Sequence, residues 1–323
     1  MLGYYQMSLI GRAHKSKDGV CQDASAIDKL ENGWVLAVTA DGLGSATNAK
    51  EGAETAVKVV REFVKENYPS IWHEESLISF LRVAFHKALK SLKNLAIKNN
   101  NSLSDYNTTL TIAIYNGICL VHGNVGDGGI IALSPYGDFS ILTEAQKGES
   151  FNETIPLQAG PDYWRFGVST EEVCAFSQMT DGIFDVVCPW ILSKTNQPIY
   201  INFVRPFMDE NLLNVSTEDD FAKTQEEIEI FLNSSCCKRI TDDKTIVGVI
   251  NTDVIPEIKP ETYYAEPDWI ALKKEHDDKL YKVTENKTNS ITTSSKKQDS
   301  KPKERKLPSF IKFLICKRLK KDI

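Results

Sequence analysis

Val35–Ser45, with the sequence VLAVTADGLGS, is an apolar run that ends abruptly in a carboxylate and a glycine-rich turn. The apolar and β-branched residues of its first half are typical of a buried strand. The glycines that follow Asp41 permit a sharp turn and let a backbone carbonyl approach a ligand. The stretch therefore predicts a core strand that carries one acidic side chain to the mouth of a site, although Asp-Gly alone is also a common turn dipeptide.

Three further strand-like segments lead into acidic side chains in the same way. The segments end at residues 126, 180 and 241, and the acids that follow them are Asp127, Asp181, Asp185, Asp242 and Asp243. Carboxylates gathered without matching basic partners repel one another unless cations lie among them. The repeated pattern therefore indicates a site for hard metal ions.

The composition is that of a globular protein with an acidic body and a basic end. The 323 residues allow one large domain or two small ones, and 41% hydrophobic and 25% charged residues are ordinary values. Residues 296–323 hold 11 basic and 3 acidic side chains, which leaves 27 basic and 41 acidic side chains before them. An acidic body argues against a broad nucleic-acid surface, so we expect no nucleic-acid partner.

The cysteines and the N-terminal residues favour a cytoplasmic protein. Seven cysteines occur without a Cys-x-x-Cys pair and several lie in apolar runs, which predicts reduced thiols rather than zinc ligands or disulfides. Residues 1–6 lack the charged and apolar regions of a secretion signal. No stretch reaches the roughly eighteen apolar residues that span a bilayer.

Two helical segments precede a series of short strands. Apolar residues recur at helical spacing over residues 48–67 and 76–99, with Ser76 as the expected cap of the second helix. Segments 108–115, 118–124, 129–133 and 139–143 alternate like strands and predict an antiparallel meander. Residues 144–169 are expected to form a surface excursion, and residues 181–242 a mostly helical insertion with helices at 186–194 and 221–233.

A basic motif near the N-terminus is expected to form a loop between two short strands. It contains Arg12, His14 and Lys15, and Asp23 follows it, where it could face the same site as Asp41. Cations beside a metal cluster orient an anionic substrate, so these three basic side chains are candidates to bind a phosphate. The alternative is that they are solvated loop charges.

Beyond residue 250 the chain loses its periodicity. We expect residues 256–306 to be an irregular to disordered linker, since residues 284–306 are rich in Lys, Thr, Ser and Asn. Residues 307–323 combine basic and apolar side chains in an amphipathic tail. Such a tail suits an anionic membrane surface, which would make the protein peripheral to a membrane, or an acidic groove on a partner; a tail without a binding role is the alternative.

Taken in order along the chain, the motifs resemble the metal-dependent protein phosphatases of type 2C in their bacterial form. They are H-x7-QD at 14–23, ADGLGS at 40–45, NTTL at 107–110, NVGDG at 124–128, TDGIFD at 180–185 and DDKT at 242–245. The resemblance implies a phosphatase domain over residues 1–255 with an α+β fold. That fold is a four-layer α-β-β-α sandwich of two mainly antiparallel sheets flanked by helices, which agrees with the helix and strand pattern.

The resemblance also implies which residues hold two manganese or magnesium ions. Asp41 matches the carboxylate that bridges the ions, and Gly42 the residue whose carbonyl helps to hold one of them. Asp181 and Asp242 match ligands of the first ion. Asp23 matches an acid in the shell of the second ion.

A third, loosely bound ion of the family matches Asp127 and Asp185 together with Asp181. In the implied reaction, two divalent ions about 4 Å apart lower the pKa of a shared water, and the resulting hydroxide attacks phosphorus in line. Asp41, Asp181 and Asp242 would thus be catalytic through this water, with no nucleophilic side chain.

Three positions depart from the family pattern. Gln22 replaces a glutamate and is an uncharged candidate ligand, and Leu43 replaces the histidine acid of animal members. Asp18 replaces an arginine that would bind the phosphate. The phosphate-binding residue is therefore unassigned, with the basic motif at residues 12–15 as the candidate.

The resemblance implies a serine/threonine phosphatase that acts on phosphoproteins and opposes a protein kinase. Two alternatives are a non-catalytic sensor or scaffold that binds a phosphoprotein or a kinase, and a phosphohydrolase of small phosphate esters. Against the scaffold, a binding module has no need for clustered acids such as Asp41, Asp181 and Asp242, whose repulsion costs stability. Competition between phosphopeptides and small esters would distinguish the second alternative.

Overall fold

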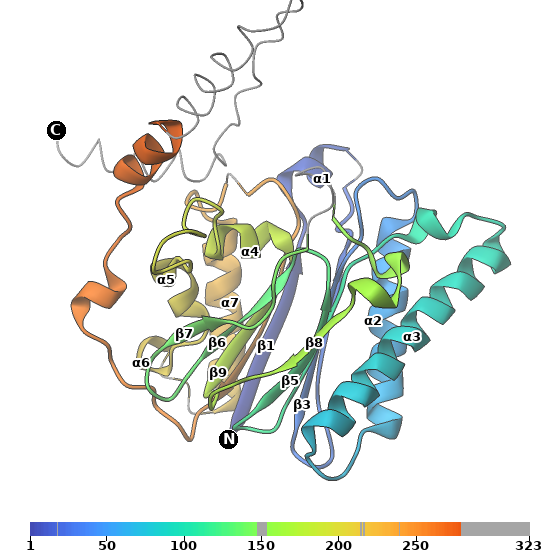
Figure 1. Cartoon of the computed structure of the whole chain (residues 1–323), viewed down its shortest axis with the longest axis horizontal. Coiled ribbons are helices and arrows are strands. Elements are labelled where there is room, and N and C mark those ends of the chain that lie inside the picture. The colour runs from blue at the N-terminus through green and yellow to red at the C-terminus, as the bar shows by residue number, and fades with distance from the viewer. Residues whose placement is uncertain (18, 147–153, 214, 216, 239, 279–323) are drawn as a thin grey trace, which may run out of the picture.

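Two five-stranded antiparallel sheets pack face to face, with helices on both outer faces (Figure 1). The computed structural model describes residues 1–17, 19–146, 154–213, 215, 217–238 and 240–278. The first sheet, in spatial order, contains β1 (Leu2–Leu9), β10 (Lys244–Asn251), β9 (Ala175–Met179), β6 (Gly129–Leu133) and β7 (Phe139–Ile141). The second contains β2 (Asp23–Lys29), β3 (Val35–Asp41), β4 (Leu110–Tyr115), β5 (Leu120–Val125) and β8 (Arg165–Val168). The expected four-layer sandwich is confirmed.

The helices divide between the two outer faces (Figure 1). The second sheet is covered by α2 (Ala49–Asn67) and α3 (Glu74–Asn99). The first sheet is covered by the expected helical insertion, which contains α4 (Asp181–Val187), α5 (Ile201–Val204), α6 (Glu210–Leu213) and α7 (Glu218–Asn233). Short 3-10 turns lie at Leu103–Tyr106, Leu157–Ala159, Pro161–Tyr163, Arg205–Phe207 and Glu261–Tyr264.

Three hydrophobic layers explain why the central strands are apolar on both faces. Every residue of β4, β5, β6, β9 and β10 is buried. One layer lies between the sheets and includes Val35, Tyr115 and Phe176, while the other two lie between each sheet and its helices. A strand that is enclosed on both faces has no polar face to show, which is why Val35–Asp41 is a continuous apolar run.

The expected meander is wrong, because its four strands divide between the sheets. The first two strands pair as β4 and β5 in one sheet, and the other two pair as β6 and β7 in the other. The chain crosses between sheets at Gly126, which has a φ of 114°. A Cβ at this position would lie 2.4 Å from Thr109 Cγ2. Glycine thus permits the crossing, but the alternation of the strands carries no signal of it.

Several local expectations also differ from the structure. The N-terminal loop is a helix, α1 (Arg12–Lys17), after an eight-residue strand. The helix expected at 186–194 begins earlier, at Asp181, and ends at Val187 before Pro189. The excursion at 144–169 includes the edge strand β8, which pairs with β5. The cap of α3 is His73, whose Nδ1 accepts a hydrogen bond from the Ser76 backbone N–H, rather than Ser76 itself.

The first part of the expected linker packs on the domain. Lys259 Nζ lies 2.7 Å from Asp138 Oδ2, and residues 269–278 are helical. Trp269 at the start of this helix is 4% exposed and packs edge-on against Tyr200. Residues 256–278 are thus not irregular throughout, because they end in a helix. Residues 279–306 and the tail at 307–323 lie outside the described residues. Within the described ranges, no helix has both the length and the apolar composition needed to cross a membrane.

Candidate metal centre

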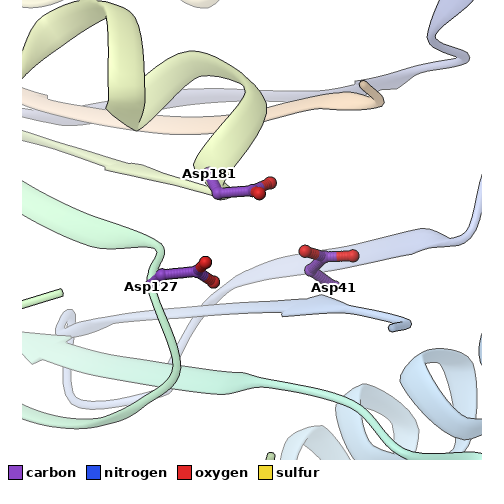
Figure 2. A group of neighbouring side chains, drawn as sticks. All are labelled: Asp41, Asp127 and Asp181. Carbon is purple, nitrogen blue, oxygen red and sulfur yellow. The ribbon is translucent and has the colours of Figure 1, made fainter. Parts of the chain in front are cut away.

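Three acidic side chains converge at one end of the sandwich (Figure 2). Asp41 is the last residue of β3, Asp127 lies in the turn between β5 and β6, and Asp181 is the first residue of α4. One carboxylate oxygen from each lies within 4.8 Å of the others. Because β3 belongs to one sheet and α4 follows a strand of the other, the packing of the two sheets assembles this acidic cluster.

Asp23 joins the cluster from the neighbouring strand. It pairs with Asp41 across β2 and β3, and its side chain is buried. Thr180 Oγ1 donates a hydrogen bond of 2.8 Å to Asp23 Oδ2, and the Thr245 N–H donates to the same hydroxyl. Burial, together with repulsion from Asp181, raises the pKa of Asp23 to about 8 in spite of these hydrogen bonds.

The remaining predicted acids, Asp242 and Asp185, affect the pKa values of the cluster by electrostatic repulsion. Burial raises the pKa of Asp41 well above its usual value, with further contributions from the carboxylates of Asp23, Asp242 and Asp127. Burial is also the main reason that the pKa of Asp181 is raised. Repulsion from the carboxylates of Asp41, Asp127, Asp242 and Asp185 raises it further. Six of the acids that the sequence singles out therefore interact electrostatically at this end of the sandwich, namely Asp23, Asp41, Asp127, Asp181, Asp185 and Asp242. Their mutual repulsion is relieved either by protons or by cations.

Asp243 holds several segments together at this end of the molecule. The sequence did not predict this structural role. Its buried carboxylate accepts hydrogen bonds from the Gly11 N–H at 2.5 Å, from His14 Nδ1 at 2.8 Å and from the Gln22 N–H at 2.6 Å. Its own N–H donates to Asp242 Oδ1 at 2.9 Å. Asp243 thus attaches α1 and the start of β2 to the turn at Asp242–Asp243, next to the acidic cluster. The only sequence signal for this role was the acidic pair itself.

The predicted phosphate-binding side chains differ in their surroundings. Nδ1 of His14 is engaged by Asp243, so only the other ring nitrogen is available to a ligand. Arg12 and Lys15 are exposed on α1, whose first turn is held against the Asp242–Asp243 turn. Position 18 lies outside the described residues.

The residues present fit a divalent cation. Gln22 Oε1 is buried and receives no hydrogen bond from the described residues. This is expected of an oxygen whose role is to bind a metal ion. At Gly42 a Cβ would lie 2.4 Å from the Ala49 carbonyl oxygen, so only glycine allows this close approach of backbone. A set of carboxylate, amide and carbonyl oxygens is the donor set preferred by magnesium and manganese.

Comparisons with known proteins identify the family. The sequence model of the protein phosphatase 2C family matches residues 10–233. The chain therefore belongs to the protein phosphatase 2C family, and its two-sheet fold is that of this family. No curated protein matches the sequence significantly.

Solved structures of phosphatases share the fold at low sequence identity. A bacterial serine phosphatase is 13% identical, with a TM-score of 0.55 over 80% of this chain and 100% of its own. The serine/threonine phosphatase Stp1 from Staphylococcus aureus is 14% identical, with a TM-score of 0.55 over 77% of this chain and 95% of its own. The catalytic domain of the serine threonine protein phosphatase PstP, solved with two manganese ions, is 15% identical, with a TM-score of 0.53 over 77% of this chain and 97% of its own.

Proposed function

We propose that this protein is a metal-dependent phosphatase that hydrolyses phosphoserine and phosphothreonine in proteins. The observation that carries the proposal is the convergence of Asp41, Asp127 and Asp181 within 4.8 Å, in a chain of the protein phosphatase 2C family. The manganese ions in the PstP structure support the same choice of metal here. A phosphoprotein substrate implies that a protein kinase supplies it.

The chain's own residues divide the work of holding the ions. Asp41, Asp181 and Asp242 would bind the ions that drive the chemistry, with Asp23 in the shell of the second ion. Thr180 fixes the orientation of the Asp23 carboxylate. When bound, the ions would lower the pKa of water and so supply the nucleophile at neutral pH.

A second group of residues would shape the site. Asp127 and Asp185, together with Asp181, would hold a third ion, and Thr154 Oγ1 donates a hydrogen bond of 2.6 Å to Asp127 Oδ2. The carbonyl of Gly42 would complete the ion shell. Arg12 and Lys15 on α1, which is attached to the Asp242–Asp243 turn, would be candidates to bind the phosphate.

Hydrolysis of a phosphothreonine peptide tests the proposal. We expect release of phosphate with manganese and none with EDTA, and we expect Asp41→Asn and Asp181→Asn each to abolish it. Asp162→Asn, at an exposed position, is the matched control and should retain full activity. Hydrolysis of small esters without any competition from phosphopeptides would favour the small-ester phosphohydrolase. A folded protein that binds manganese but hydrolyses neither substrate would favour the scaffold.

A further inference from the structure

The outer edge of β2 presents free backbone groups beside the metal centre. β2 pairs with β3 alone and is the edge strand of its sheet. The backbone of Asp41 exchanges hydrogen bonds with Thr109 on the opposite side, so it points away from β2. Hydrogen bonding alternates between the two sides of a strand in an antiparallel sheet. Ala40 and Val38 of β3 therefore bond toward β2, where they pair with Ala24 and Ala26.

It follows that the backbone N–H and C=O groups of Ser25 and Ile27 point outward. Among the described residues, no backbone group pairs with them. The edge of β1 is covered differently, because Gln225 Oε1 on α7 accepts a hydrogen bond of 3.3 Å from the Gln6 N–H. An open strand edge is a template for another extended chain, and proteins usually block such edges.

Residues 24–26 of this edge line a groove. The groove has a volume of about 590 Å³ and runs between β2 and the face of α2 that carries Val57, Lys58 and Arg61. This volume leaves space for an extended segment beside Ser25, which is one of the lining residues. A ligand in this groove would meet strand backbone on one side and helix side chains on the other.

The helix wall carries as many acidic as basic side chains, and most of the basic ones form ion pairs within the protein. Arg61 Nε and Lys65 Nζ bind the carboxylate of Asp28 at 2.5 and 3.1 Å, and Lys58 Nζ lies 4.0 Å from Glu62 Oε1. The groove therefore has little net charge with which to select a charged ligand. Glu54 and Glu66 also line the groove, and they balance the lysine and arginine charges of the helix wall. The strand backbone adds donors and acceptors that carry no net charge.

The direction of β2 connects this groove with the metal centre. The strand starts at Asp23, within the acidic cluster, and continues through Ser25 and Ile27 away from it. At about 3.3 Å per residue, these positions lie roughly 7 and 13 Å from Asp23 along the strand. We propose that the groove binds the phosphoprotein substrate as an extended segment that adds to β2 as a further strand, with the phosphorylated residue at the Asp23 end.

This inference rests on the proposed phosphatase function and narrows its substrate class. The substrate would be an extended segment with about four ordered residues on one side of the phosphorylated residue. Main-chain hydrogen bonds would supply most of the affinity, so dependence on the substrate's side chains would be weak. A compact phosphorylated helix would be a poor substrate.

Single N-methylation of the substrate backbone tests the inference. A phosphothreonine peptide would be methylated at one amide nitrogen at a time, over five residues on each side, and kcat/KM measured with manganese. On one side only, we expect alternate positions to lose about tenfold, because each methyl removes a donor to the strand edge and adds bulk there. The intervening positions should change by less than about twofold, since their N–H groups point away from β2. Losses without alternation, or no losses, would overturn the inference.

Hydrolysis of para-nitrophenyl phosphate, measured in parallel, separates this inference from the proposed function. Hydrolysis of the ester together with a flat methylation profile would overturn strand addition and leave the phosphatase intact. Absence of hydrolysis of both substrates would overturn the phosphatase and the inference with it.

A groove variant provides a second test. Lys58→Trp places an indole on the groove wall from a side chain that is 73% exposed, and Lys90→Trp makes the same change on α3 as the control. We expect Lys58→Trp to lower the ratio of peptide to ester kcat/KM about tenfold and Lys90→Trp to leave it unchanged. Equal ratios for the two variants would contradict the proposed groove.

Discussion

Asp181→Asn should stabilise the metal-free protein and remove its response to manganese. The substitution keeps the shape of a side chain whose carboxylate lies within 4.8 Å of those of Asp41 and Asp127. At an effective dielectric constant of about 20, two charges at this distance repel by roughly 3.5 kcal/mol. Protonation already relieves part of this repulsion, because the pKa of Asp181 is raised well above its usual value. We therefore expect a net gain of about 2 kcal/mol at pH 8, or roughly 4–8 °C in Tm.

The effect has a defined pH dependence. In the folded protein the pKa values of Asp23, Asp41 and Asp181 are raised. At a pH between the unfolded and folded pKa values, the folded state therefore binds more protons than the unfolded state. The stability of the metal-free wild type should consequently fall as the pH rises from 6.5 to 8, and this fall should be smaller in Asp181→Asn. The lower limit is 6.5 because buried His122 has a pKa lowered to about 4, so its protonation in the unfolded state would oppose the trend in more acidic solution.

Thermal unfolding with EDTA and with manganese, at both pH values, provides the assay. With EDTA at pH 8 the variant should be more stable than the wild type. Saturating manganese should reverse this order, since a ligand at 100 times its Kd stabilises the wild type by about 2.7 kcal/mol. Asp162→Asn should behave like the wild type throughout. A destabilised variant in EDTA, or equal stabilisation of wild type and variant by manganese, would refute the account of the acidic cluster.

Three further substitutions test the packing that supports the site. Gly182→Ala should lower stability by about 2 kcal/mol or more in chemical denaturation, because its Cβ would lie 2.0 Å from the Asp243 carbonyl oxygen; an unchanged midpoint would contradict this close contact. Asp28→Asn should cost about 1–3 kcal/mol at pH 7. Burial opposes ionisation of Asp28, but the hydrogen bonds of Arg61 lower its pKa, so the difference from wild type should shrink as the pH falls below about 4. Trp269→Ala should lower stability by about 3 kcal/mol and expose residues 256–278 to limited proteolysis, whereas unchanged cleavage would show that this segment is held by other contacts.

Much of the site could be predicted from the sequence because its signals are local. Asp41, Asp127 and Asp181 lie at or just after the ends of strands, and at each of these positions an Asp-Gly pair marks the point where the strand ends. The ordered motifs identify the fold and its acids without reference to any long-range contact. The structure brings these acids together as expected, although the metal-binding role of each remains a prediction.

The tertiary structure decided the features that have no local signal. The assignment of β4–β5 and β6–β7 to different sheets depends on which surfaces the other elements leave open, and the alternation within the strands is the same either way. Asp243 organises the site only because Gly11, His14 and Gln22 reach it from more than 200 residues away in the sequence. The open edge of β2 is likewise a property of strand order. Sequence therefore determined which side chains bear charge at strand ends, while the packing of the two sheets decided what surrounds them, because hydrogen-bond partners and burial are set by contacts between distant segments.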